Sequence, residues 1–289
     1  MLSFLSIFAC IDFGDPSYVS ELRVMAVQSE PAEFSPLDES LQLNILVADP
    51  KKQTAEALIW PCTNLGNGCL EAEFFEGNLE NWVSVIELSE GINSFSLSLP
   101  LELGFLLSDI PEEDLPLNLT SIWILACPPE ECSAIEKVKA GQIDAGKLGD
   151  PSQFLVNLPM NTASLAKRSL FLSNRSLETR IQNPILSPQT DEIPTSAPNQ
   201  DNEIQISYAL QSLESEGSRF SVYTSLGSIV EERGPPGSSE PMDLEGEYPI
   251  QWNSGSEPGS GFLYVIVENS DGGIGLWTES LSVVVPATQ

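Results

Sequence analysis

The sequence contains no histidine, and this absence excludes more chemistry than any other feature of the chain. Histidine is the commonest side chain for acid–base work near neutral pH and the commonest metal ligand. Ser-His-Asp and Cys-His catalytic arrangements are therefore impossible, and the many catalytic zinc sites that use histidine are excluded with them. We expect no cofactor, no metal site and no catalytic residue.

Basic residues are also scarce. Twelve Lys and Arg stand against 42 Asp and Glu, which gives a formal net charge of −30. Between Gln53 and Glu136 the chain has fifteen acidic residues and no basic one. Such a chain repels the phosphate backbone of nucleic acids, which excludes them as partners. It also repels anionic lipid, so attachment to a membrane requires a covalent or apolar anchor.

Long apolar runs are missing, since the stretch from Met1 to Ala9 is far shorter than the roughly 20 residues that span a bilayer. "LSIFAC" (5–10) has the apolar core and small residue of an export signal, without the basic residues that normally precede them. We interpret 1–10 as a truncated lipoprotein signal peptide, cleaved before a lipidated Cys10, and 11–20 as a tether. The alternative is a buried N-terminal strand that contains a free cysteine.

Without Cys10, the five cysteines reduce to two close pairs. Cys62 and Cys69 bracket "TNLGNG", and Cys127 and Cys132 bracket "PPEE". In an exported protein such pairs indicate disulfides that close short loops. Local bridging is our first interpretation, and Cys62–Cys127 with Cys69–Cys132 is the second. Neither spacing matches a CxxC zinc ligand pair.

Short apolar and alternating runs, separated by prolines and turn residues, predict an all-β chain of two immunoglobulin-like (Ig-like) β-sandwich domains in tandem. Domain 1 covers 21–173, with a short helical or irregular insertion at 133–146. A Ser-, Asn- and Pro-rich linker follows at 174–202, although 183–186 is alternatively the first strand of domain 2. Domain 2 covers 203–289 and contains a hairpin (262–285) whose turn is "NSDGG" (269–273).

Three oxygen-rich segments are the candidate polar sites. Residues 109–114, "DIPEED", could furnish the two carboxylates that glycoside hydrolysis needs, although a solvated acidic loop is the simpler interpretation. The turn 269–273 and "DNE" (201–203) offer calcium ligands, but neither has the spacing of a calcium loop. Trp60 and Trp123 are predicted in the first core, and Trp252 and Trp277 in the second.

The chain resembles a mostly uncharacterised group of bacterial, myxobacterial-type lipoproteins. The likeness lies in "DFGDPSYVSELRVMAVQSEPAEFSP" (12–36), "LVADP" (46–50), the Trp-x-Cys strand at 60–62, and two C-terminal segments, "YTSLGSIVEERG" (223–234) and 250–283. It covers about half of the chain. The resemblance implies tandem Ig-like modules on a lipid anchor and brings no assigned activity with it.

From these features we expect a non-catalytic lipoprotein of a Gram-negative cell envelope, in the outer membrane or periplasm. It would serve as a structural or interaction module for other envelope proteins or surface ligands, because sandwiches present loops as stable binding surfaces. The alternatives are a calcium-dependent adhesin and an envelope hydrolase with paired carboxylates.

Overall fold

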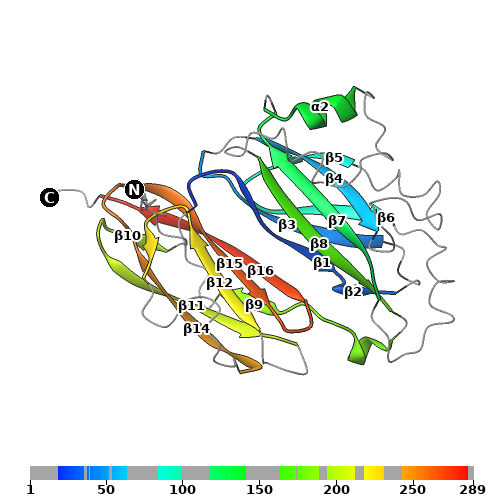
Figure 1. Cartoon of the computed structure of the whole chain (residues 1–289). Coiled ribbons are helices and arrows are strands. Elements are labelled where there is room, and N and C mark those ends of the chain that lie inside the picture. The colour runs from blue at the N-terminus through cyan, green and yellow to red at the C-terminus, as the bar shows by residue number, and fades with distance from the viewer. Residues whose placement is uncertain are drawn as a thin grey trace, which may run out of the picture.

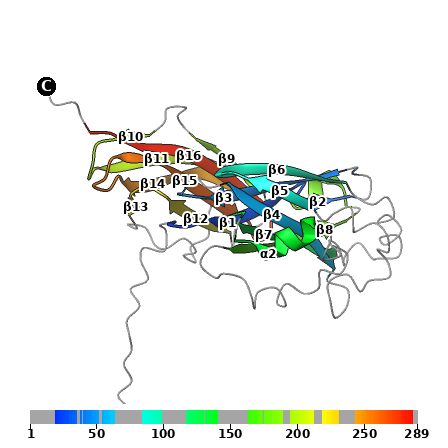
Figure 2. The same ribbon diagram turned by 90° about the horizontal axis from the view of Figure 1, so that it is seen from above.

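In the computed structural model the chain forms two β-sandwiches that lie side by side (Figures 1 and 2). The prediction of an all-β chain with Ig-like sandwiches is confirmed. The structure describes residues 19–35, 38, 40–51, 54–63, 84–98, 117–129, 131–140, 163–173, 175–188, 194–211, 218–230 and 243–285.

The first sandwich consists of a three-stranded and a five-stranded sheet. The three-stranded sheet has the order β1 (Arg23–Glu30), β3 (Ser40–Ala48), β6 (Gly91–Ser98). The five-stranded sheet has the order β2 (Glu33–Phe34), β8 (Ser164–Leu172), β7 (Leu117–Cys127), β4 (Ala55–Thr63), β5 (Ser84–Leu88). Because β2 pairs in parallel with β8, the chain changes sheets directly after β1.

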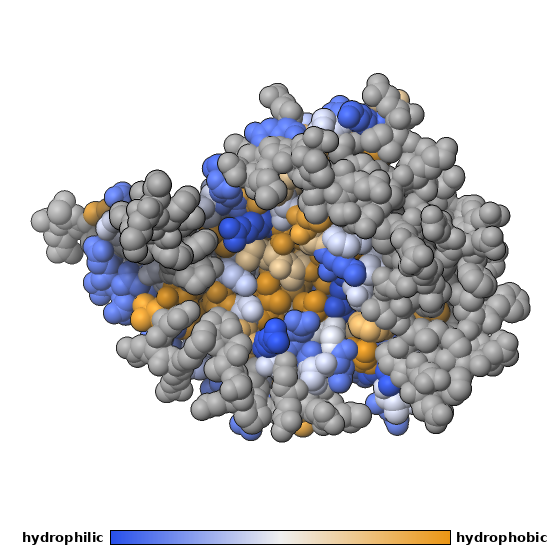
Figure 3. Space-filling model, viewed as in Figure 1, coloured by the Kyte–Doolittle hydropathy of each residue, from blue (hydrophilic) through white to orange (hydrophobic). Residues whose placement is uncertain are grey.

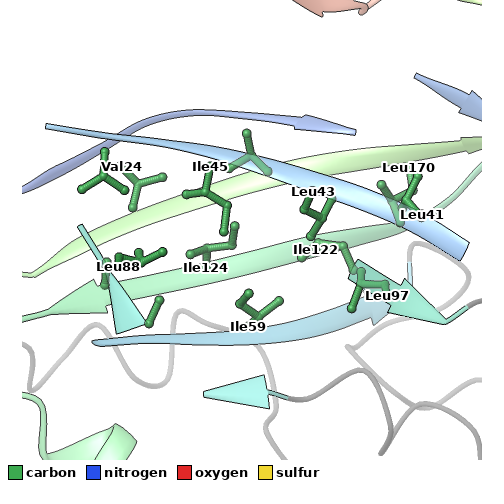
Figure 4. Close-up of a cluster of buried hydrophobic side chains, with 14 of the residues drawn as sticks. Val24, Leu41, Leu43, Ile45, Ile59, Leu88, Leu97, Ile122, Ile124 and Leu170 are labelled. Atoms are coloured by element: carbon green, nitrogen blue, oxygen red, sulfur yellow. The ribbon is translucent and has the colours of Figure 1, made fainter. Parts of the chain in front are cut away.

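The core between these sheets is built from the alternating positions of their strands. Leu41, Leu43 and Ile45 of β3 point toward Ile122 and Ile124 of β7, and all five are fully buried (Figure 4). The period-two alternation of a half-buried strand thus decides which face of each sheet is covered.

A second, smaller core lies outside the five-stranded sheet. Helix α2 (Ser133–Lys139) covers that face and places Ile135 against Trp60 and Leu125. This helix confirms the helical insertion expected within 133–146, and it covers residues 133–139. The tryptophan of β4 therefore packs under α2 and not between the two sheets, because its side chain points to the opposite face from Ile59.

The second sandwich consists of two four-stranded sheets. One has the order β13 (Ser228–Ile229), β14 (Glu245–Asn253), β11 (Asp201–Ala209), β9 (Ile185–Pro188). The other has the order β10 (Thr195–Ser196), β16 (Ile274–Val283), β15 (Gly259–Glu268), β12 (Arg219–Thr224). Apart from the short β10, this is the arrangement of a constant-type Ig domain.

Trp252 is central to the second core. It is fully buried and donates its indole N–H to the carbonyl oxygen of Leu226 at 2.7 Å. Trp277 from β16 belongs to the same core, as the sequence predicted. A polar donor in an apolar core is tolerated here because it has a backbone acceptor.

The expected linker, 174–202, contributes strands to the second sandwich. β9 pairs with β11 and β10 pairs with β16, so this sandwich begins near the alternative start at 183–186. The connection itself is the short stretch 175–184, which contains a single 3-10 turn, η5 (Leu177–Thr179). β9 and β10 have only four and two residues, which is too short for the alternation that marks a strand in sequence.

Candidate functional site

Among the described residues, an apolar cluster and several hydrogen bonds meet at the junction between the two sandwiches. Its centre is an apolar cluster of Val19, Leu46, Ala48 and Tyr264, each fully buried. Leu46 and Ala48 lie on the outward face of β3, and Tyr264 lies on the outward face of β15. Figure 3 shows the molecule from the same side as Figure 1, with apolar surface in the middle, over the junction.

The N-terminal end of the described chain is part of this junction. Val19 donates its backbone N–H to the carbonyl oxygen of Thr224 at 2.9 Å, which extends the edge of β12. Val19 therefore lies between the two sandwiches and not at the far end of either one.

Tyr264 also links the sandwiches by a polar contact. Its hydroxyl donates to Oε1 of Glu90, in the β5–β6 turn, at 2.6 Å. Burial, reinforced by the hydrogen bond to Glu90, raises the pKa of Tyr264 above its ordinary value. The neutral tyrosine is thus the form that fits the junction.

The hairpin turn 269–273 contacts the first sandwich. Arg168 of β8 donates from Nη1 to the carbonyl oxygen of Gly272 at 2.9 Å and from Nη2 to Oγ of Ser29 at 3.1 Å. Burial lowers the pKa of Arg168 to about 10, a change that Glu268 opposes, so the guanidinium remains charged at neutral pH. Gly272 has φ +92°, and a Cβ there would lie 3.4 Å from the ring of Phe171. The turn thus serves as an interdomain contact.

Asn183, just before β9, bonds to both sandwiches. Its Nδ2 donates to the carbonyl oxygen of Ser29 and to Oε2 of Glu30, both at 2.8 Å. Its Oδ1 accepts the backbone N–H of Ile274 at 3.0 Å. Gln28 completes the link by donating from Nε2 to the carbonyl oxygen of Ile274 at 2.6 Å. One amide side chain thus fixes the connecting segment against both bodies.

A buried ion pair also holds the connecting segment to the first sandwich. Glu33 is fully buried and forms a two-pronged contact with the guanidinium of Arg175. Its Oε2 also accepts the backbone N–H of Ile181 at 2.9 Å. A buried carboxylate is stable only when its oxygens are satisfied in this way.

A hollow of about 470 Å³ opens where the connection meets both sandwiches. We call it the junction hollow; it is lined by residues 30–33, 180–183, Ile185 and Gln211. Pro31, Ala32, Ile181 and Ile185 supply its apolar wall, and Ile185 is 52% exposed. Its volume is within the range of small-molecule pockets.

Of the predicted cysteine sites, one disulfide is described. Cys127 and Cys132 are bonded, with their Cα atoms 5.7 Å apart, which is the local pairing and excludes the alternative Cys62–Cys127. The bridge joins the end of β7 to the residue before α2. Cys62 lies in β4, and the predicted sites at Cys10 and Cys69 lie outside the described residues.

The oxygen-rich segments have other partners in the structure. Asp201 accepts from Nδ2 of Asn253 at 2.7 Å, and Glu203 accepts from Nε2 of Gln251 at 2.6 Å. Asn269 uses its Oδ1 to accept the backbone N–H of Gly273 at 2.6 Å and so closes the turn. Within the described ranges no group of three or more Cys, Asp and Glu is placed to hold a metal ion. The acidic segment 109–114 lies outside them.

The sequence contains a signal for the junction that the predictions above did not use. "FLYVIV" (262–267) is apolar on both faces of its strand, whereas a sheet with one solvated face alternates. In β3 the alternation stops at Asn44, and the following "ILVA" (45–48) is continuous. Each continuous run marks the part of a strand that the other sandwich covers.

No protein-family profile and no curated protein matches this chain. Solved structures resemble it only distantly. They include an alpha-2-macroglobulin of E. coli, with 9% identity and a TM-score of 0.31. This match covers 91% of the present chain and 17% of the macroglobulin. The D0–D1 domain of intimin has 12% identity and TM-score 0.25 over 90% of this chain and 98% of that chain. Fibronectin(III)-like modules of Clostridium thermocellum CbhA have 9% identity and TM-score 0.22, over 90% and 94%.

This chain thus spans about one sixth of the macroglobulin, and these likenesses concern the fold alone. In the part of the chain that the structure describes, no helix is both long and apolar enough to cross a bilayer.

Proposed function

We propose that this protein is a lipid-anchored module of the bacterial cell envelope that works by binding, as a rigid two-sandwich scaffold. The observation that carries the proposal is the junction. Two domains joined only by a linker move independently, whereas here an apolar cluster and hydrogen bonds from Asn183, Arg168 and Tyr264 join them. A rigid body holds its exposed loops at fixed distances, which lowers the entropic cost of binding.

The anchor is inferred from the apolar "LSIFAC" segment and from charge. A net charge of −30 opposes adsorption to anionic lipid, so attachment requires a covalent or apolar anchor. The apolar run 1–9 is too short to span a bilayer, which favours a covalent acyl group. Residues 11–18 separate Cys10 from Val19. Eight residues reach at most about 30 Å when fully extended, so an anchored body would lie close to the membrane.

Mass spectrometry of the protein extracted from membranes of the producing cell tests the anchor. We expect a chain that begins at Cys10 and carries diacylglycerol, and a Cys10→Ser variant that is released to the soluble fraction with the same folded body. An intact Met1 with an unmodified Cys10 in the soluble fraction would refute the anchor.

Chemical cross-linking in intact cells tests the binding role. We expect the wild-type protein to give discrete cross-linked species with other envelope proteins. Recovery of the uncross-linked monomer alone, over a range of reagent lengths, would contradict a scaffold function.

A further inference from the structure

The junction hollow adjoins a strongly acidic surface of the second sandwich. The outward positions of β11 and β14 carry Asp201, Glu203, Glu245 and Glu247, which we call the acidic strand face. The strands β9, β11, β13 and β14 contain no Lys or Arg. Whatever binds across this sheet therefore meets carboxylates without basic neighbours from the same strands.

Strand register places the two features next to each other. Ala209 of β11 pairs with Ile185 on one side and with Glu245 on the other. Since neighbouring strands lie about 4.8 Å apart, the apolar wall of the hollow and the first carboxylate are separated by roughly 10 Å. Leu244, beside Glu245, is 47% exposed and adds a second apolar side chain at this end of the sheet.

The charges inside the hollow leave a net negative rim. Arg180 lies 4.0 Å from the carboxylate of Asp38, and Arg175 is paired with Glu33, so these two cations are compensated. Glu30 has a neutral partner, the amide of Asn183, and is exposed at the rim. A ligand that carries positive charge would complement Glu30 and the acidic strand face together.

We propose that the junction hollow and the acidic strand face together bind a basic peptide segment of a partner protein. A large apolar side chain of that segment enters the hollow against Ile185, and lysine or arginine side chains on either side of it meet Glu30 and Glu245. Apolar anchoring gives affinity, and charge complementarity gives orientation and a faster encounter. This inference deepens the proposed function, because it names the chemistry of a partner for the scaffold.

Fluorescence anisotropy with the soluble full chain and a labelled, end-capped peptide Lys-Leu-Lys-Leu-Lys tests the proposal. We expect saturable binding that weakens as salt rises from 20 to 300 mM, because exposed charges are then screened. The peptide Lys-Ser-Lys-Ser-Lys, which keeps the charge and removes the apolar side chains, is expected to bind at least fivefold more weakly. Glu-Leu-Glu-Leu-Glu should not bind.

Matched variants separate a site from general charge attraction. Ile185→Ser is expected to weaken the binding of Lys-Leu-Lys-Leu-Lys about fivefold, and Glu245→Gln about threefold at 20 mM salt. Glu87→Gln makes the same charge change at an exposed residue of β5, in the first sandwich, and should have no effect. Circular dichroism and thermal unfolding show whether each variant keeps its fold.

Equal weakening by Glu87→Gln and Glu245→Gln, with no effect of Ile185→Ser, would overturn the proposal, since binding would then follow net charge alone. Absence of any binding at 20 mM salt would also overturn it. Because the assay uses soluble protein, its result is independent of whether Cys10 carries a lipid.

Discussion

Replacing Tyr264 by Phe removes one hydroxyl from the junction and leaves the ring in place. The hydroxyl donates to Glu90 across the two sandwiches at 2.6 Å. A hydrogen bond to a charged group contributes about 1.5–3 kcal/mol to stability. Glu90 is only half-buried and can recruit water after the change, so we expect a loss of about 1.5 kcal/mol in the free energy of unfolding. That corresponds to a fall in the unfolding temperature of about 3–6 °C.

Urea unfolding of wild type, Tyr264→Phe, Glu90→Gln and the double variant measures the coupling between the two side chains. We expect the double variant to lose clearly less than the sum of the single losses. Tyr223→Phe is the matched control, because Tyr223 belongs to the same cluster and is the strand partner of Tyr264 within the second sandwich. Additive single losses, or equal losses for Tyr264→Phe and Tyr223→Phe, would refute the interdomain bond as a source of stability.

The same residue predicts how stability responds to alkaline pH. Burial first, and the bond to Glu90 second, raise the pKa of Tyr264 in the folded protein, whereas an unfolded tyrosine titrates near 10. The folded state then binds more protons than the unfolded state above about pH 10. The stabilising contribution of this residue is therefore fully present below pH 10 and declines as the pH rises further. Tyr264→Phe should make the alkaline decline shallower; an unchanged slope would count against this explanation.

Three further changes test other parts of the fold. Gly227→Ala should cost about 3 kcal/mol or more, because Gly227 has φ +75° and a Cβ there would lie 2.0 Å from the carbonyl oxygen of Asn253. Gly259→Ala is its control, because a Cβ at Gly259 would make only an ordinary van der Waals contact. In thermal unfolding its free energy of unfolding should stay within about 0.5 kcal/mol of the wild-type value. Cys132→Ala should lower the free energy of unfolding, measured in urea, by about 2 kcal/mol, because the bond to Cys127 closes a short loop. Adding a reductant to the wild-type protein should lower its free energy of unfolding by the same amount. Calcium at 5 mM should move the unfolding temperature by less than about 1 °C, because amide groups already occupy the carboxylates of β11.

The sandwiches were predictable because alternation of apolar and polar residues is a local property. Leu41, Leu43 and Ile45 alternate with Gln42 and Asn44, so the sequence alone identifies the buried face of β3. The "NSDGG" turn is equally local, since Gly272 adopts the positive φ that its position requires. For such segments a short window of sequence contains the full cause of the local structure.

The junction could not be predicted in the same way, because its contacts join residues that lie far apart in the chain. Tyr264 meets Glu90, and Arg168 meets Gly272, across separations of 174 and 104 residues. A buried arginine has the same local sequence as an exposed one, so only the assembled fold distinguishes them. The continuous apolar runs 45–48 and 262–267 indicate that a second face is covered, without saying what covers it.

The position of Val19 between the two sandwiches has a mechanical consequence. Tension applied through residues preceding it would act first on the bond to Thr224 and on the cluster that Val19 shares with Tyr264. Load would thus reach both sandwiches at once, in parallel, whereas a linear string of domains transmits it through one domain after another. A body suspended from this point would resist pulling as a single unit until the junction yields.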